Sequence, residues 1–405
     1  MTTPTNEPNN IEADPIPVSA ATTEKNDEAR RRFLLIFLLV LLTLCCVAGY
    51  FIFRYIAAPQ PLPQMIPVIS NAYYQPTYKF SITLDKPVGV AVSPDAQRIY
   101  ATESEKDRLI KMFDRDGKYI TNFAPPFTSK SNRQLTYIAV NTDGRVFVVD
   151  GYNDVLCVFD KDGNFLDGLI SRDVTLSGFV TKQLGQQLPA GTIYYYDNTN
   201  HQVVYQLPGQ PTQRVDGPDR KNWGVMGMRF NSAGDLLITS PVKGNTEVLV
   251  YPAADINGSW SNFHPSIKEF GTEGKGNGQF SYPNSVVQDS KGNYYISDSN
   301  NGRISVWNSA MSYQSFFGYG SSDSALNLPR GIWMDAHDRL HVTDAVGGVI
   351  RVYDVSGTEP AFLASLGLFG TAEGQFNFPN DITMDKTGRL YIADVDNNRI
   401  QVWSY

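Results

Sequence analysis

Carboxylate and amide side chains recur in this sequence directly after short apolar runs. Seven such runs, of which RIYATE and RLYIAD are two, lead into loops that carry Asp150, Asn153, Asp154, Asp197, Asn200, Asp298, Asn300, Asn301, Asp344, Asp394, Asp396 and Asn397. Their oxygens suit a cationic, polyhydroxylated or metal-bound partner, but Asp and Asn also accept hydrogen bonds from loop backbone. A residue that every repeat unit requires has a structural role in the unit, so we predict that the recurrent Asp stabilises the repeat rather than binding a ligand.

Residues for metal or nucleophilic catalysis are scarce. The four histidines are His201, His264, His337 and His341. Only His337 and His341 have ligand-like spacing, and they are expected in a turn and a strand rather than on one helical face. The sequence shows no Ser-His-Asp arrangement and no G-x-S-x-G turn. We therefore predict no catalytic residue, no cofactor and no zinc, whereas calcium bound by Asp and Asn oxygens stays open and any metal site stays unknown.

The elements that carry these residues repeat along the chain. The seven runs start 43 to 58 residues apart, and the fullest copies add a strand opened by Pro before the run and two strands after it. Four such strands form an antiparallel blade that cannot bury both faces alone, which predicts an all-β propeller of seven blades. The orphan run 78–84 is expected to supply the fourth strand of the last blade.

Two stretches, FGTEGKGNGQFSYPNSVVQDSKGNYYISDSNNGRISVW (270–307) and FGTAEGQFNFPNDITMDKTGRLYIADVDNNRIQVW (369–403), resemble complete NHL repeats. The resemblance covers about residues 78–405 and is weak in the third and fourth units. It implies an NHL-type β-propeller, and because members of that family most often have six blades, six is the alternative to seven. The glycine-rich segment 271–278 is interpreted as a repeat connector rather than a phosphate loop.

One face of the ring is the candidate site. Because neighbouring strands run antiparallel, the Pro-x start of each first strand and the loop after the recurrent Asp are expected on the same face, and the NHL resemblance makes that face the usual recognition surface. The strand starts include Val88, Asn284, Arg330 and Asn380, with Asp381 beside the last. We predict that Asn284, Arg330, Asn380 and Asp381 bind the ligand, with Arg330 as an isolated cation near the channel.

The N-terminal region predicts a membrane anchor. Residues 1–32 are predicted to be a disordered cytoplasmic tail, 33–57 a transmembrane signal-anchor helix, 58–77 a Pro-rich stalk and 78–405 the propeller. Arg30, Arg31 and Arg32 precede the apolar run and only Arg54 follows closely, so the N-terminus is expected in the cytoplasm and the propeller outside it. The anchor makes the membrane a partner.

Composition narrows the function. The chain has 34 Lys and Arg against 41 Asp and Glu, for a net charge of −7, which argues against nucleic acid as a partner. We expect a membrane-tethered binding or scaffold module for a protein, peptide or cell-envelope glycan. The alternative is a metal-dependent envelope lyase or hydrolase with its site at the channel mouth. The insertion 254–266, with Trp260 and Phe263, is expected either to contact a partner or to cover a blade edge.

Overall fold

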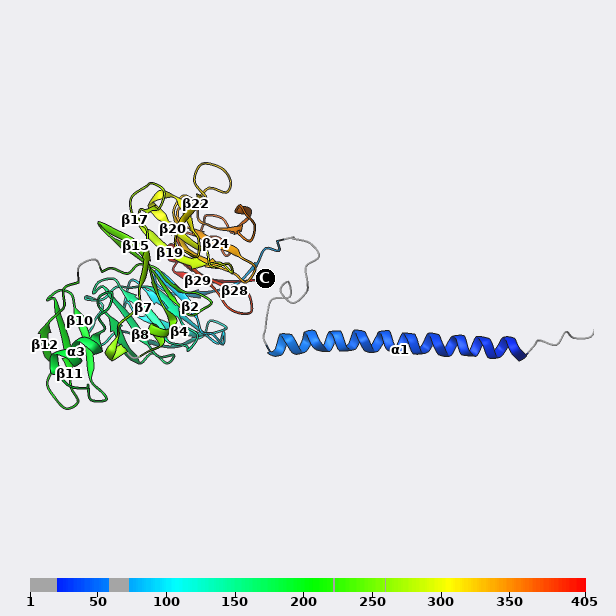
Figure 1. Cartoon of the computed structure of the whole chain (residues 1–405), viewed down its shortest axis with the longest axis horizontal. Coiled ribbons are helices and arrows are strands. Elements are labelled where there is room, and N and C mark those ends of the chain that lie inside the picture. Colours follow the sequence, from blue (N-terminus) through cyan, green and yellow to red (C-terminus); the bar gives the residue numbers. More distant parts are fainter. Residues whose placement is uncertain (1–19, 58–72, 221–222, 259) are drawn as a thin grey trace, which may run out of the picture. The chain divides into compact units, whose positions relative to one another are not determined.

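The computed structural model describes residues 20–57, 73–220, 223–258 and 260–405 (Figure 1). It divides into two compact units, residues 1–59 and 60–405, which we describe separately. Residues 1–19 of the predicted tail and 58–72 of the predicted stalk lie outside the described residues.

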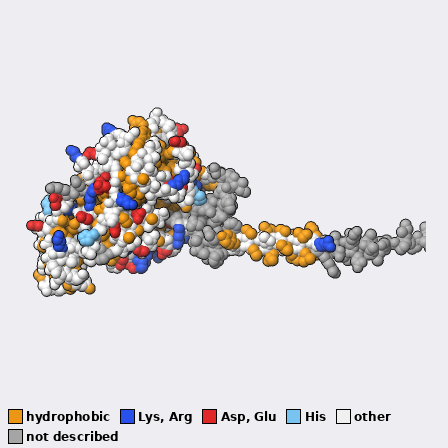
Figure 2. Space-filling model, in the orientation of Figure 1, with side chains coloured by type: hydrophobic (Ala, Val, Ile, Leu, Met, Phe, Trp, Pro, Cys, Tyr) orange, Lys and Arg blue, Asp and Glu red, His pale blue; other side chains and the backbone are white. Residues whose placement is uncertain are grey.

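The first unit contains one long helix, α1 (Ala20–Ala57). Its segment Arg32–Tyr50 has a mean hydropathy of 2.8 and is long and apolar enough to cross a membrane. Figure 2 shows its apolar side chains as a continuous orange band that ends at a blue basic group. The helix begins at Ala20, N-terminal to the predicted start at Phe33. Residues 20–32 are rich in Ala, Glu, Lys and Arg, which favour helix continuation.

The second unit is built from six four-stranded antiparallel sheets, which we call blades. Blades 1 and 2 comprise β2 (Pro87–Val92), β3 (Arg98–Glu103), β4 (Ile110–Asp114) and β5 (Tyr119–Phe123), then β6 (Leu135–Val140), β7 (Val146–Asp150), β8 (Val155–Phe159) and β9 (Phe165–Leu169). Blade 3 comprises β13 (Met228–Phe230), β14 (Leu236–Val242), β15 (Asn245–Tyr251) and β16 (Lys268–Phe270).

Blade 4 comprises β19 (Pro283–Gln288), β20 (Tyr294–Asp298), β21 (Arg303–Trp307) and β22 (Tyr313–Phe317), and blade 5 comprises β23 (Pro329–Met334), β24 (Arg339–Asp344), β25 (Val349–Asp354) and β26 (Ala361–Leu366). Blade 6 comprises β27 (Pro379–Met384), β28 (Arg389–Asp394), β29 (Arg399–Ser404) and β1 (Thr77–Thr83). Short elements connect these strands: α4 (Ala253–Asn257), η1 (Trp260–Asn262), β17 (Thr272–Glu273), β18 (Gln279–Phe280), η2 (Ser299–Asn301) and η3 (Val395–Asn397).

The N-terminal strand closes the last blade, as the sequence predicts. Strand β1 runs antiparallel to β29, pairing Thr77 with Ser404 and Thr83 with Arg399. Ile82 of β1 is buried in a core shared by blades 6 and 1. The closure therefore removes an open strand edge and joins the two ends of the propeller chain.

The first strands of the blades form a closed cycle. Strand β2 packs against β6, β6 against β13, β13 against β19, β19 against β23, β23 against β27, and β27 against β2. This arrangement matches the six-bladed alternative rather than the seven-bladed prediction. We call the face at which these inner strands begin the top face, and the face at which they end the bottom face.

The predicted third unit forms a separate three-stranded sheet, the outer sheet, made of β10 (Ile193–Asp197), β11 (Gln202–Gln206) and β12 (Gln213–Asp216). Figure 1 shows it in green beside α3 (Leu176–Leu184), projecting from the blades. Tyr195, Tyr196 and Val203 of this sheet share a core with blade 2. In the described part of the chain the unit has no inner strand, because the segment before β10 forms α3 and a loop.

Glycine alternates with larger residues around the cycle of inner strands. The equivalent positions are Gly89, Tyr137, Gly227, Ser285, Gly331 and Asp381, in blade order. A Cβ atom at Gly89 would lie 2.5 Å from the Thr136 carbonyl oxygen, and one at Gly331 would lie 2.6 Å from the Asp381 Cα. Both distances are too short for a residue with a Cβ atom. Glycine at this position in every second blade therefore allows the inner strands to pack closely around the ring.

The insertion 254–266, which lies between β15 and β16 of blade 3, acts as a cover. Trp260 and Phe263 are both buried and join the core between blades 2 and 3. The Trp260 Nε1–H donates to the Ile256 carbonyl at 2.9 Å, and the Thr175 hydroxyl before α3 donates to the Trp260 carbonyl at 2.5 Å. Of the two expectations for this segment, the structure supports the cover.

Candidate functional site

The Asp at the end of the second strand holds the repeat together in blades 2, 4, 5 and 6. In blade 4, Asp298 accepts hydrogen bonds from Ser281 N at 2.7 Å, Asn301 Nδ2 at 2.7 Å and Arg303 Nε at 2.9 Å. In blade 6, Asp394 receives the same three bonds, from Asn377, Asn397 and Arg399. Both carboxylates are fully buried. The structural role predicted for the recurrent Asp is thus confirmed in these blades.

A buried ion pair braces the centre of the ring. Arg229 of β13 donates through Nη2 to Asp381 Oδ1 of β27 and to the Ile382 carbonyl, so it links blades 3 and 6 across the cycle. Asp381 Oδ2 also accepts the Val90 backbone N–H of blade 1 at 3.1 Å. Burial raises the pKa of Asp381, against the opposing effect of Arg229. Asp381, predicted to bind the ligand, instead binds neighbouring blades.

Asn284 and Asn380 meet at Tyr137. The Tyr137 hydroxyl donates to Asn284 Oδ1, and Asn380 Nδ2 donates to the same hydroxyl at 3.3 Å and to the Val88 carbonyl at 2.8 Å. All three side chains are buried, and burial raises the Tyr137 pKa to about 12, so the phenol stays protonated at neutral pH. Asn284 Nδ2 is buried without a partner in the described residues. This amide donor is therefore unsatisfied inside the ring.

Arg330 differs from the other three predicted residues. It is partly exposed, and within the described residues it makes no ion pair or hydrogen bond, although its Nε atom is buried. The guanidinium lies 5.9 Å from the Tyr282 ring centroid and 5.6 Å from the Phe378 ring centroid. It also acts electrostatically on Tyr137. Arg330 is thus a cation held between two aromatic rings at the top of the channel.

The two flanking aromatic residues are held in an unusual backbone conformation. Tyr282 has φ of 62° and Phe378 has φ of 59°, and each directly precedes the proline that opens an inner strand. Left-handed φ costs a bulky residue about 1–2 kcal/mol. Sequence reasoning missed both residues and Tyr137, although the recurring Tyr-Pro and Phe-Pro steps were visible in the sequence.

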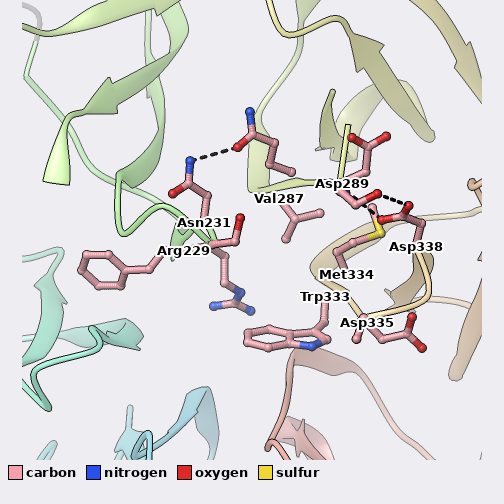
Figure 3. Close-up of a pocket in the computed structure, with 13 residues that line it drawn as sticks. Arg229, Asn231, Val287, Asp289, Trp333, Met334, Asp335 and Asp338 are labelled. Carbon is pink, nitrogen blue, oxygen red and sulfur yellow. Dashed lines mark hydrogen bonds between the residues drawn. The ribbon is translucent and has the colours of Figure 1, made fainter. Parts of the chain in front are cut away.

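The bottom face has a pocket of its own that sequence analysis did not predict. It has a volume of about 470 Å³ and lies where β13, β19 and β23 end (Figure 3). The figure shows Arg229 and Trp333 at one side and the carboxylates of Asp289, Asp335 and Asp338 at the other. These carboxylates already accept bonds from turn groups, such as Ser290 Oγ to Asp338 at 2.5 Å. The pocket therefore offers mainly the Trp333 and Met334 surfaces.

The described residues contain no group of three His, Cys, Asp or Glu side chains that could hold a metal ion. His341 is buried and bonds the Tyr405 hydroxyl through Nε2 at 2.9 Å, and burial lowers its pKa. Because its ring nitrogens are engaged in blade contacts, we assign His341 to the core and not to a site.

Comparison with known proteins agrees with this architecture. The NHL repeat family matches residues 280–307 and 376–403, which form most of blades 4 and 6. The chain contains NHL repeats. The comparison with curated proteins gives no match.

Solved structures share the fold. Virginiamycin B lyase from Staphylococcus aureus is similar over 80% of this chain and 98% of its own, with 14% identity and a TM-score of 0.50. A structural genomics protein of unknown function from Bacteroides thetaiotaomicron is similar over 82% of this chain and 72% of its own, with 14% identity and a TM-score of 0.48. At this identity the likeness concerns the fold, and the NHL-type β-propeller predicted from the sequence is confirmed.

Proposed function

We propose that this protein is a membrane-tethered, extracytoplasmic binding module whose top face takes a carboxylate group of a protein, peptide or cell-envelope glycan. The observation that carries this proposal is Arg330, the predicted site residue whose charge has no partner in the described part of the chain. A ligand carboxylate can bond the guanidinium while Tyr282 and Phe378 contact its apolar part.

This proposal is more specific than the sequence-based expectation, which left a cationic, polyhydroxylated or metal-bound partner open. The recurrent carboxylates of blades 4 and 6 accept bonds from their own repeats, so they do not favour a cationic ligand. Asn284 Nδ2 adds an unpaired donor near Tyr137. Donors without acceptors favour an anionic or carbonyl-bearing group over a metal ion.

The membrane tether and its direction belong to the same proposal. The apolar segment Arg32–Tyr50 supports the tether, and Arg30 to Arg32 support a cytoplasmic N-terminus. A cysteine introduced at Ser321, in an exposed top-face loop, should react with a membrane-impermeant maleimide on intact cells, whereas one introduced at Asn9 should react only after permeabilisation. The opposite pattern would reverse the orientation.

The binding proposal is tested with the full-length protein purified in mild detergent. We would capture partners from solubilised membranes by crosslinking and compare Arg330→Gln with Arg145→Gln, which removes a cation from a turn on the bottom face. Arg330→Gln should reduce capture at least about ten-fold, since a charge-assisted contact contributes roughly 1.5–3 kcal/mol. Arg145→Gln should leave capture unchanged. Equal capture by both variants would contradict the assignment of the site to Arg330.

A metal-dependent lyase or hydrolase is the alternative function. Among the described residues no cluster of side chains supports it, and the likeness to the lyase concerns the fold alone. We therefore propose only the binding function for this protein.

A further inference from the structure

A second cavity lies on blade 4, away from the inner strands. Its volume is about 340 Å³, and we call it the blade 4 pocket. The lining residues come from the connector before β19, from η2, from the start of β21, and from the outer strand β22 and the loop after it. They are Lys275, Asn277, Asn300, Asn301, Arg303, Phe316 and Tyr319. These elements place it on the top face.

Two exposed aromatic side chains form one part of the pocket. Phe316 is 42% exposed and Tyr319 is 71% exposed, and their rings meet edge to face with centroids 6.3 Å apart. The Arg303 guanidinium lies 4.9 Å from the Phe316 centroid and holds that ring in place. Exposed aromatic rings at a polar cavity offer flat apolar surfaces on which another ring can stack.

The polar lining carries excess positive charge. Arg303 is neutralised by Asp298 at 2.9 Å and donates through Nη2 to the Gly276 and Gln279 carbonyls. Lys275 is exposed and makes no ion pair or hydrogen bond to any described residue. The amides of Asn277 and Asn300 complete the rim. The unbalanced charge of the pocket is therefore that of Lys275.

Blade 6 provides an internal reference for this pocket. Its Arg399 bonds Asp394 and the Ala372 and Gln375 carbonyls just as Arg303 bonds its own partners. The two connectors thus align with no gap from Gly274 and Gly370 onward, so the equivalent positions can be compared one by one.

At these equivalent positions the scaffold is shared but the lining is not. Lys275, Asn277 and Asn300 correspond to Thr371, Glu373 and Asp396 of blade 6. Phe316, which pairs with Ser305, corresponds to Ser81, which pairs with Gln401. Blade 6 is therefore acidic and lacks this aromatic ring where blade 4 is basic and aromatic. The repeat itself requires none of these blade 4 residues, which leaves ligand binding to explain them.

We propose that the blade 4 pocket binds an acidic saccharide, with a pyranose ring stacked on Tyr319 and in contact with Phe316, its hydroxyls on the Asn277 and Asn300 amides, and its carboxylate on Lys275. Stacking suits the apolar face of a sugar ring, amides suit hydroxyl groups, and the single unbalanced cation suits one carboxylate. This site is separate from Arg330 and does not depend on the channel-mouth proposal.

The test uses the full-length protein in detergent and two probes of equal length, a galacturonate trisaccharide and the neutral galactose trisaccharide of the same linkage. Titration calorimetry should show tighter binding of the acidic probe. Lys275→Gln should weaken binding of the acidic probe by about five-fold and leave the neutral probe unchanged. Tyr319→Ala should weaken both by roughly ten-fold.

Two controls separate this site from the rest of the propeller. Glu373→Gln, at the blade 6 position equivalent to Asn277, and Arg145→Gln, in a turn on the bottom face, should each leave the affinity for the acidic probe unchanged. Tyr319 is so exposed that its truncation is expected to leave the fold intact, which circular dichroism checks. The proposal is overturned if the acidic probe does not bind at roughly 10 mM, if the two probes bind equally, or if Lys275→Gln retains full affinity.

Discussion

Blade 4 and the outer sheet carry the same strand pattern but use its final Asp differently. In blade 4, Asp298 is fully buried and reaches back to the Ser281 N–H, just before the inner strand begins. In the outer sheet, Asp197 bonds Thr199, Asn200 and Arg214, all within its own sheet and turn, and its side chain is 22% exposed. In blade 4, which has an inner strand, the Asp therefore bonds the connector that precedes this strand. In the outer sheet, which has no inner strand, the Asp bonds only its own turn and sheet.

Blades 2 and 5 show the same backward hydrogen bond as blade 4. Asp150 accepts the Gln134 N–H and Asp344 accepts the Leu328 N–H, each from the start of the preceding inner strand. A strand ending in Asp therefore indicates a hairpin, and in blades 2, 4, 5 and 6 the backward hydrogen bond joins that hairpin to an inner strand.

The largest expected effect is the loss of this backward bond. Asp298→Ala should lower the free energy of unfolding by about 3–5 kcal/mol, since it leaves the buried Arg303 unpaired. Urea denaturation of the full-length protein, followed by tryptophan fluorescence, measures it. A loss below about 1 kcal/mol would mean that Asp298 does not hold the blade.

The attachment of the outer sheet should depend on pH. Asp167 of β9 is buried and accepts the Ser177 N–H of α3 at 3.1 Å, and burial raises its pKa to about 6 from 3.8. A raised carboxyl pKa stabilises the fold at low pH, and that stabilisation is lost as pH rises through 6. The loss should reach about 2 kcal/mol between pH 4 and 7.

Asp167→Asn should remove most of this pH dependence, because the amide does not ionise. The matched control is Asp116→Asn, which alters a carboxylate that is 86% exposed. Denaturation curves at pH 4 and 7 compare the three proteins. If Asp167→Asn retains the full slope of the parent protein, the pH dependence arises elsewhere.

The smallest stability effect is expected in the outer sheet. Asp197→Ala removes a partly exposed ion pair with Arg214 and bonds confined to one turn, so it should cost about 1 kcal/mol or less. The same denaturation assay applies. A loss equal to that of Asp298→Ala would erase the distinction between blade and outer sheet.

Much of the fold was predictable from the sequence, because strands, turns and repeats are local features. The closing strand β1 and the structural role of the recurrent Asp followed from that pattern. The blade number did not follow, because the third unit keeps a hairpin but its preceding segment forms α3. The absence of an apolar run of strand length directly before Thr192 was the signal that would have separated this unit from the blades.

The contacts of the predicted site residues could not be predicted from the sequence. Asn284 and Asn380 bond Tyr137, Asp381 bonds Arg229, and these partners come from other blades. Such contacts across the ring cannot be derived from one repeat, since they depend on which blades face each other. Arg330 alone keeps an unpaired charge there.

We propose that the recurrent carboxylates of the top face stabilise the repeats, whereas Arg330 binds the ligand. The most direct measurement combines unfolding free energy and partner capture for Arg330→Gln and Asp298→Asn in the full-length protein. We predict that Arg330→Gln changes stability by less than about 0.5 kcal/mol yet loses capture, and that Asp298→Asn loses stability. Retained capture together with lost stability in Arg330→Gln would contradict the account.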